Sequence, residues 1–181
     1  MTPSHAVAEA AVTALVSCGV RHVVLCPGSR SAPLAYRLAR AQQDGELRLW
    51  VRHDERVAAF TALGMARAAA PAAVVTTSGT AVANLHPAVL EAHHAGVPLI
   101  VVSADRPSAL RGTWANQTTE LQPDLFGEAL RARLDTAEAD LGHLIAVLEH
   151  ACGVGNSRPG PVHLNLCLPE PLLPAGPTTP R

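Results

Sequence analysis

Two arginines in this sequence lie where a guanidinium group can bind a carboxylate. Arg30 belongs to Pro27-Gly28-Ser29-Arg30-Ser31, which opens a helix; the glycine lets the backbone approach a ligand closely, and the arginine can donate two parallel hydrogen bonds. Arg106 follows an apolar run and is a second candidate for binding a carboxylate. The structural alternatives are a surface arginine on an ordinary capped helix and an Asp105–Arg106 ion pair that shapes the turn.

A charged tetrapeptide, His53-Asp54-Glu55-Arg56, separates a strand-like run from a helix-like run. Residues 47–51 before it alternate between apolar and polar, and the apolar spacing after it is helical as far as Ala70. Its acids therefore lie where a strand leads into a helix, which is the end where ligands bind in an open parallel α/β sheet. The structural alternative is that Asp54 caps the helix and Glu55 complements its positive end.

Polar loops follow four successive strand-like runs, and this predicts one polar rim along one edge of a sheet. The loops are Cys26–Ser31, His53–Arg56, Thr76–Thr80 and Ala104–Pro107. Farther along the chain, Asn116-Gln117 offer hydrogen-bond donors and acceptors for a polar substrate, with a solvated loop as the alternative. They lie in a long polar segment, and such segments in compact domains are usually functional or disordered.

Several common kinds of site are not indicated by the sequence. It contains no G-x-G-x-x-G after the first strand, no P-loop pattern, and no G-x-S-x-G around Ser78. His93 and His94 are adjacent, so on a helix they point in different directions and cannot form an i, i+4 metal pair. The four cysteines show no metal-binding spacing and are expected to be reduced. We therefore predict no metal site within this chain.

Strand-like and helix-like runs alternate along the sequence. This alternation predicts a doubly wound α/β fold, with a mostly parallel sheet of about six strands and helices on both faces. Pro87 lies inside the fourth helical run and predicts a break near His86. The expected strands cover 21–26, 47–52, 72–77, 99–103, 132–134 and 161–166, and the expected helices cover 6–18, 31–42, 57–70, 81–95 and 137–152.

Length and composition predict one globular domain over 1–168 and a Pro-rich, semi-rigid linker over 169–181 that leads toward further domains. Hydrophobic residues make up 48% of the chain and charged residues 16%, a balance typical of a packed core. The net charge of −1 gives no reason to expect nucleic acid or an acidic membrane as a partner. Without a signal sequence or a membrane-length apolar run, a cytoplasmic protein is expected.

Five segments, in this order and spacing, carry a resemblance to a known family. They are CPGSRSAPL at 26–34, HDER at 53–56, TSGTAVANL at 77–85, SADRP at 103–107 and ANQT at 115–118. Together they resemble the amino-terminal domain of the 2-succinyl-5-enolpyruvyl-6-hydroxy-3-cyclohexene-1-carboxylate (SEPHCHC) synthases. The resemblance implies a thiamine diphosphate-dependent transferase of menaquinone biosynthesis, which decarboxylates 2-oxoglutarate and adds the succinic semialdehyde unit to isochorismate.

The same resemblance implies roles for individual residues. Glu55 matches the catalytic glutamate that contacts the aminopyrimidine ring of thiamine diphosphate and assists proton transfer there. Pro27, Ser78 and Gly79 match positions near the pyrimidine. The residues that match the isochorismate side of the site are Ser29, Arg30, Arg106, Asn116 and Gln117.

The family pattern also implies partners for this chain. Mg²⁺ and the diphosphate are held by a domain that carries G-D-G followed by Asn, and this sequence contains no such segment. The resemblance therefore implies half of a site, completed by the diphosphate-binding domain of a second subunit in a homo-oligomer, and a chain that is inactive alone. The alternatives are a stand-alone subunit of a thiamine-dependent 2-oxoacid decarboxylase and a non-catalytic assembly module.

Overall fold

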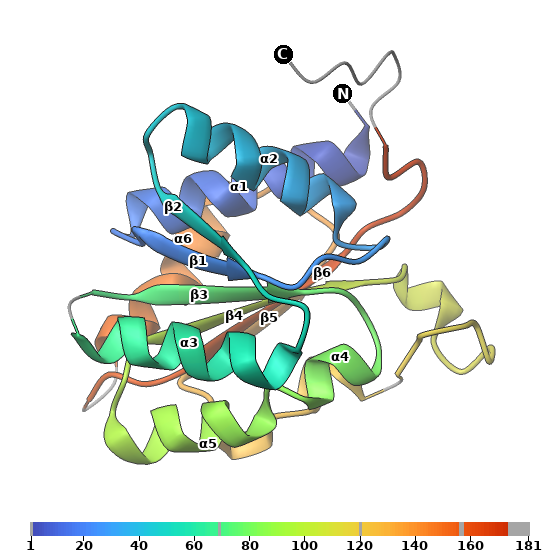
Figure 1. The fold of residues 1–181 in the computed structure, drawn as a ribbon. Coiled ribbons are helices and arrows are strands. Elements are labelled where there is room, and N and C mark those ends of the chain that lie inside the picture. Colours follow the sequence, from blue (N-terminus) through green and yellow to red (C-terminus); the bar gives the residue numbers. More distant parts are fainter. Residues whose placement is uncertain (1, 69, 120, 156–157, 174–181) are drawn as a thin grey trace.

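The strands form one parallel sheet in the order β2-β1-β3-β4-β6-β5 (Figure 1). The computed structural model describes residues 2–68, 70–119, 121–155 and 158–173. Each pair of neighbouring strands runs parallel, which confirms the predicted parallel α/β fold. The strands are β1 His22–Leu25, β2 Arg48–Val51, β3 Ala72–Thr76, β4 Leu99–Asp105, β5 Ala132–Thr136 and β6 Val162–Cys167.

Helices cover both faces of the sheet, and each face has its own apolar core. On one face lie α1 Pro3–Ser17, α2 Ala32–Gln43 and α6 Leu141–Glu149. On the other lie α3 Glu55–Ala68, α4 Thr80–Ala83 and α5 His86–Ala95. Short 3₁₀ turns complete the chain: η1 Ser108–Leu110, η2 Gln122–Asp124, η3 Gly127–Ala129 and η4 His150–Cys152.

The crossover connections between the parallel strands all have the same handedness. Where the chain steps from β1 to β2 or from β5 to β6, the intervening helix lies on the face of α1, α2 and α6. Where it steps the opposite way, to β3 and then to β4, the helices lie on the other face. This is the handedness rule for parallel sheets, and it makes the loops after the neighbouring strands β1 and β3 diverge to opposite faces. Ligands of open α/β sheets bind in the crevice at such a point.

Two helices, α1 and α6, begin at other residues than the sequence predicts, and in both a capping side chain determines the first residue. The first helix begins at Pro3 rather than at residue 6, because the Thr2 side chain accepts from the His5 amide and proline is well suited to the first turn. The last helix begins at Leu141 rather than at residue 137, because Asp140 accepts from the His143 amide at 3.0 Å. The break near His86 is confirmed by the separate helices α4 and α5.

The described part of the predicted linker packs against the domain. Leu172 is 5% exposed and belongs to the apolar core beneath α1, α2 and α6. Ser4 donates a hydrogen bond to the Pro169 carbonyl, and Glu170 forms an ion pair with Arg30 at 3.2 Å. Residues 174–181, the rest of the predicted linker, lie outside the described residues.

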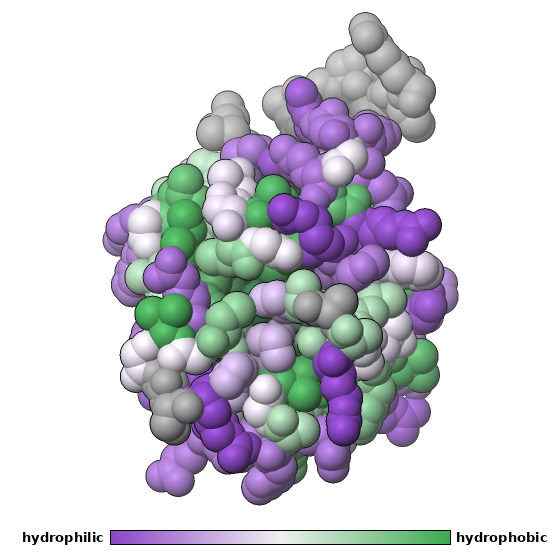
Figure 2. All heavy atoms as spheres, turned by 90° about the vertical axis from the view of Figure 1, so that its left-hand side faces the viewer, coloured by the Kyte–Doolittle hydropathy of each residue, from purple (hydrophilic) through white to green (hydrophobic). Residues whose placement is uncertain are grey.

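Figure 2 shows the edge of the molecule at which the strands begin, where hydrophobic residues occupy much of the middle and hydrophilic residues gather toward the rim. A cavity of about 370 Å³ has Cys18, Ile100 and Cys152 in its lining. No helix within the described ranges has both the length and the hydropathy needed to cross a membrane.

A row of polar side chains is buried between β4 and β6. Ser103, His163 and Asn165 are each at most 1% exposed. The Ser103 hydroxyl donates to Asn165 Oδ1 at 2.8 Å and lies 2.7 Å from His163 Nε2, so Nε2 carries the proton that the hydroxyl accepts. Burial lowers the pKa of His163 to about 3, even though the negative charge of Asp135 opposes this shift. The imidazole is therefore neutral in the folded protein.

Leu148 tests the core beneath α6. Its side chain is 1% exposed, so Leu148→Ala leaves a cavity and is expected to lower the free energy of unfolding by about 2–5 kcal/mol, measured by urea titration. Leu141→Ala in the same helix is the matched control, because Leu141 is 38% exposed; its effect is expected to stay within about 0.5 kcal/mol. Equal losses in the two variants would contradict this account of the core.

His163 predicts a particular dependence of stability on pH. Its pKa in the fold is about 3 and its ordinary value is 6.5, so between these values the unfolded chain binds a proton that the folded chain does not. The free energy of unfolding should therefore fall as pH decreases below 6.5, by about 1.4 kcal/mol per pH unit from this group. Urea titrations at several pH values should show a shallower slope in His163→Gln. Parallel profiles for the two proteins would show that His163 is not the group responsible.

Candidate functional site

Arg106, directly after β4, is the centre of the polar contacts at the edge where the strands end. Its Nη1 donates to Ser78 Oγ at 2.8 Å and to the Gln117 carbonyl at 2.7 Å. Its Nε and Nη2 make no hydrogen bond to any described residue. The expected alternative of an Asp105–Arg106 ion pair is wrong, because the Asp105 carboxylate pairs with Arg111 at 3.0 Å. Arg106 is therefore held from one side and keeps donors for a further partner.

Arg30, at the start of the second helical segment, lies close enough to Arg106 to influence it electrostatically. Its Nη1 donates to the Leu168 carbonyl at 2.8 Å and pairs with Glu170, and its Nε is buried without a partner among the described residues. Burial lowers the pKa of Arg106, and the positive charge of Arg30 lowers it further. Two guanidinium groups that repel each other at one edge form a favourable place for an anion.

Two glycines let the loops at this edge approach one another. A Cβ at Gly28 would lie 2.5 Å from the Thr77 Cβ, so the loops after β1 and β3 touch there. Gly79 has φ 81°, and a Cβ added to it would lie 3.1 Å from the Gln117 carbonyl oxygen. The expectation that Gly28 provides room for a ligand is therefore corrected: its missing side chain makes room for Thr77.

Glu55 is the first residue of α3 and lies at the same edge, on the face of α3, α4 and α5. Its Oε2 accepts a hydrogen bond from Asn84 Nδ2 at 3.1 Å, and within the described ranges it forms no ion pair. Burial raises the pKa of Cys26, at the end of β1, to about 12, and the charge of Glu55 contributes to that shift. The carboxylate is thus half-buried near the end of β1, with its second oxygen uncommitted among the described residues.

Asp54, the neighbour of Glu55, has the structural role that the sequence offered as the alternative. Its Oδ1 accepts from the Arg56 and Val57 amides at 2.9 and 3.2 Å, which caps α3. Its carboxylate also pairs with the Arg56 guanidinium at 2.9 Å. The hydrogen bond from Arg56 and the capping bonds lower the pKa of Asp54 to about 2. The two adjacent acids therefore differ: Asp54 is committed to the helix and Glu55 is not.

The structure brings together only part of the predicted site. Ser78, Gly79, Arg106 and Gln117 are in mutual contact, and Arg30 is coupled to them through charge. Within the described part of the chain, Glu55 is joined to neither arginine by a hydrogen bond or an ion pair; its partner is Asn84. Three predicted residues remain: Pro27, Ser29 and Asn116. All three are exposed, and their side chains make no hydrogen bond to described residues.

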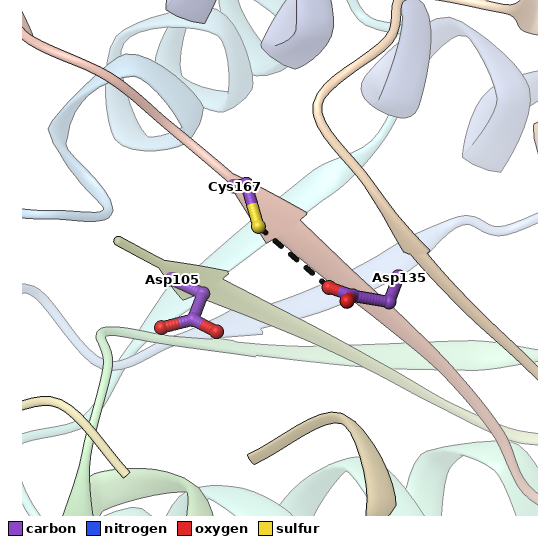
Figure 3. Close-up of side chains that lie close together, drawn as sticks. All are labelled: Asp105, Asp135 and Cys167. Atoms are coloured by element: carbon purple, nitrogen blue, oxygen red, sulfur yellow. Dashed lines mark hydrogen bonds between the residues drawn. The ribbon is translucent and has the colours of Figure 1, made fainter. Parts of the chain in front are cut away.

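Beside Arg106 lies a cluster of acids that the sequence did not reveal. Ligand atoms of Asp105, Asp135 and Cys167 lie within 4.8 Å of one another (Figure 3). Arg111 donates to Asp135 at 2.7 Å and to Asp105 at 3.0 Å, and the Asn165 amide donates to both carboxylates at 2.7 and 3.0 Å. Arg111 balances one of the two carboxylate charges, and hydrogen bonds from Arg111 and Asn165 occupy both carboxylates, so we assign the cluster as an ion-pair network rather than a metal site.

The pKa values of the cluster agree with this assignment. Burial raises the pKa of Asp135, but the hydrogen bonds from Arg111 and Asn165 outweigh it and lower the net value. Burial raises the pKa of the Cys167 thiol to about 12, so the thiol keeps its proton. The signal for this cluster in the sequence is Asn165, which with His163 interrupts an apolar strand; Arg111 and Gln122 lie in an irregular segment and carry no pattern.

Comparisons with known proteins agree with the architecture and with the loops. The family model described as thiamine pyrophosphate enzyme, N-terminal TPP binding domain, matches residues 5–127. SEPHCHC synthase of Kineococcus radiotolerans is 54% identical over 97% of this chain and 33% of its own length. The enzymes so named from Paenarthrobacter aurescens and Nocardia farcinica are 56% and 52% identical, over 93% and 96% of this chain and 30% and 35% of their own lengths.

The match covers nearly all of this chain but about a third of each relative. The family model spans the loops after β1 and β3, the start of α3, and the segment after β4, which are the elements that carry the candidate site. The chain therefore belongs to the family of N-terminal TPP-binding domains of thiamine pyrophosphate enzymes.

Proposed function

We propose that this chain is the pyrimidine-binding domain of a SEPHCHC synthase, a thiamine diphosphate-dependent transferase of menaquinone biosynthesis. The whole enzyme would decarboxylate 2-oxoglutarate and add the succinic semialdehyde unit to isochorismate in the cytoplasm. The observation that carries this proposal is the geometry of Arg106, whose Nη1 is held by Ser78 and the Gln117 carbonyl while Nε and Nη2 have no partner among the described residues. Both substrates are carboxylates, and the relatives with this name match nearly the whole chain.

The residues present fit the aminopyrimidine half of thiamine diphosphate. Glu55 is half-buried and has an uncommitted carboxylate oxygen, so it can accept a hydrogen bond from a ring nitrogen and share a proton with it. Asn84 orients that carboxylate from the other side. Ser78 and Gly79, with Pro27 at the neighbouring loop, would line the ring. When bound, the cofactor supplies the electron sink that decarboxylation needs.

The anionic substrates would bind on the side of the arginines. Ser78 and the Gln117 carbonyl hold Nη1 of Arg106, which leaves Nε and Nη2 to donate to a carboxylate. A carboxylate there would offset the repulsion between Arg106 and Arg30. Ser29 and Asn116, exposed on the flanking loops, would supply further polar contacts.

We propose that a second subunit completes the site. In the first turns of α3, which begins at Glu55, Val57 and Phe60 are 52% and 47% exposed and line one surface hollow, an apolar surface that a partner chain would cover. The diphosphate-binding domain of that subunit would hold Mg²⁺ and the diphosphate in a homo-oligomer. In the full-length protein, residues 1–168 would form the pyrimidine-binding domain and 169–181 the start of the linker.

Glu55→Gln tests the role of the carboxylate. In the full-length enzyme it is expected to lower the turnover of 2-oxoglutarate with isochorismate by roughly 10²–10⁴-fold, because the amide cannot take up a proton. Circular dichroism and the melting temperature should stay those of the wild type. Glu91→Gln, on the exposed side of α5, is the control and should keep wild-type turnover. Near-normal turnover by Glu55→Gln would exclude Glu55 as the catalytic acid.

Arg106→Ala tests the substrate side. Loss of a charged hydrogen-bond donor is expected to raise the KM for isochorismate roughly tenfold to a hundredfold in steady-state assays of the full-length enzyme. The matched control is Arg67→Ala, since Arg67 is exposed at the other end of α3. If both variants keep the wild-type KM, Arg106 is a structural residue of the turn.

A further inference from the structure

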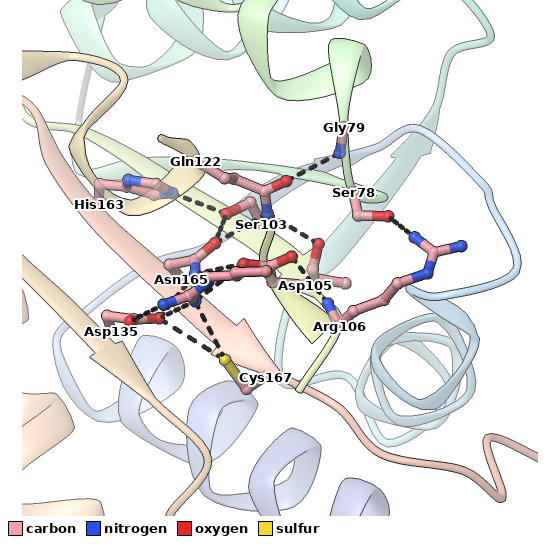
Figure 4. A network of polar contacts seen from close by, with 12 residues as sticks. Ser78, Gly79, Ser103, Asp105, Arg106, Gln122, Asp135, His163, Asn165 and Cys167 are labelled. Atoms are coloured by element: carbon pink, nitrogen blue, oxygen red, sulfur yellow. Dashed lines mark hydrogen bonds and ion pairs between the residues drawn. The ribbon is translucent and has the colours of Figure 1, made fainter. Parts of the chain in front are cut away.

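Gln122 is a buried side chain to which the sequence and the proposed function assign no role. It begins η2, inside the irregular segment that joins β4 to β5, and it is 0% exposed. Its Oε1 accepts a hydrogen bond from the Gly79 amide at 2.8 Å. Its Nε2 donates to the Ala104 carbonyl at 3.1 Å and to Asn165 Oδ1 at 2.8 Å. The carboxamide therefore joins the turn after β3 to the ends of β4 and β6 (Figure 4).

The three bonds specify a carboxamide at position 122. Both amide hydrogens face acceptors and the amide oxygen faces a donor. An apolar side chain of the same length would leave the Gly79 N–H without its partner in a buried place, which is costly. A carboxyl group keeps the acceptor for Gly79 and, facing two acceptor oxygens in a buried place, takes up a proton.

A short path leads from Gln122 to Arg106. The amide that Gln122 binds belongs to the Ser78–Gly79 peptide, and Gly79 has φ 81° and ψ −140°, a conformation that glycine alone adopts readily. Ser78 Oγ in turn accepts the hydrogen bond from Arg106 Nη1 at 2.8 Å. Fixing the plane of this peptide therefore fixes the hydroxyl against which Arg106 rests.

On its other side, Gln122 is hydrogen-bonded to Asn165, which is buried in the interior of the sheet. Asn165 is 1% exposed, and its Oδ1 accepts from both Gln122 and Ser103. Its Nδ2 donates to Asp105 and Asp135, which both form ion pairs with Arg111. Gln122 is thus the link between a rigid buried network and a turn at the edge of the sheet.

We propose that Gln122 is a positioning residue that aims the guanidinium of Arg106 at the carboxylate of an anionic substrate, acting through the Ser78–Gly79 turn. This rests on the proposed function, since it takes Arg106 as the carboxylate-binding group. It assigns the specificity of the site for anions to a residue that lies wholly in the interior.

The test is a double-mutant cycle in the full-length protein, with isochorismate as the probe and calorimetric titration as the measurement. Gln122→Met is expected to weaken the dissociation constant about fivefold to tenfold in the wild-type background and less than about twofold in Arg106→Ala, because the two residues act in one path. The melting temperature should fall by the same amount in both backgrounds. Gln122→Glu keeps the acceptor for Gly79, so it should bind within about twofold of the wild type even where it lowers the melting temperature.

Leu148→Ala is the control for lost stability alone, because Leu148 lies in the apolar core beneath α6 and its side chain takes no part in these hydrogen bonds. It should lower the melting temperature and leave the dissociation constant unchanged. The proposal is overturned if Gln122→Met binds like the wild type, if it weakens binding equally in both backgrounds, or if Gln122→Glu binds as poorly as Gln122→Met. A wild-type protein that binds isochorismate in this pattern but does not turn it over with 2-oxoglutarate would overturn the proposed function and leave the role of Gln122 intact.

Discussion

Polar groups that are buried at the ends of β4 and β6 must find their hydrogen-bond partners inside the protein, and the arrangement of the whole edge depends on this constraint. Asn165 is surrounded by Ser103, Gln122, Asp105 and Asp135, and each of these accepts from it or donates to it. An unpaired polar group in such a place costs about 1–3 kcal/mol, so removing any one member leaves others unsatisfied. The network therefore holds its members in one arrangement.

The three arginines at this edge differ because their surroundings differ. Arg111 lies between two carboxylates, and the hydrogen bonds that it donates to them raise its pKa despite burial. Arg30 has one exposed carboxylate, Glu170, and a carbonyl as partners. Arg106 has only a hydroxyl and a carbonyl, and burial together with Arg30 lowers its pKa. Among the described residues, Arg106 is therefore the arginine of the three whose charge has no carboxylate partner.

Asp54 and Glu55 are adjacent acids with different hydrogen-bond partners: Asp54 caps α3, and Glu55 contacts Asn84. The first carboxyl group at a helix start is within reach of the free amides of the first turn, and Asp54 uses both its oxygens on Arg56 and Val57. Glu55 begins the helix itself, and its longer side chain reaches across to Asn84 between α4 and α5. Because Asp54 satisfies the amides and the neighbouring guanidinium, Glu55 is left with an oxygen for other use.

The sequence by itself determined the order and type of the elements and the loops that form the edge. Apolar strands such as 72–77 and 99–103 are readable because a parallel sheet buries both faces, and the glycines and prolines mark where each strand ends. Only the tertiary structure decided the partners: Arg111 with Asp135, Gln122 with Gly79, and Glu55 with Asn84 rather than with an arginine. These pairs lie 24 to 43 residues apart in the chain, and they meet because the sheet places β6 beside β4 and β1 beside β3. Local periodicity reports which face a residue takes and carries no information about such distant neighbours.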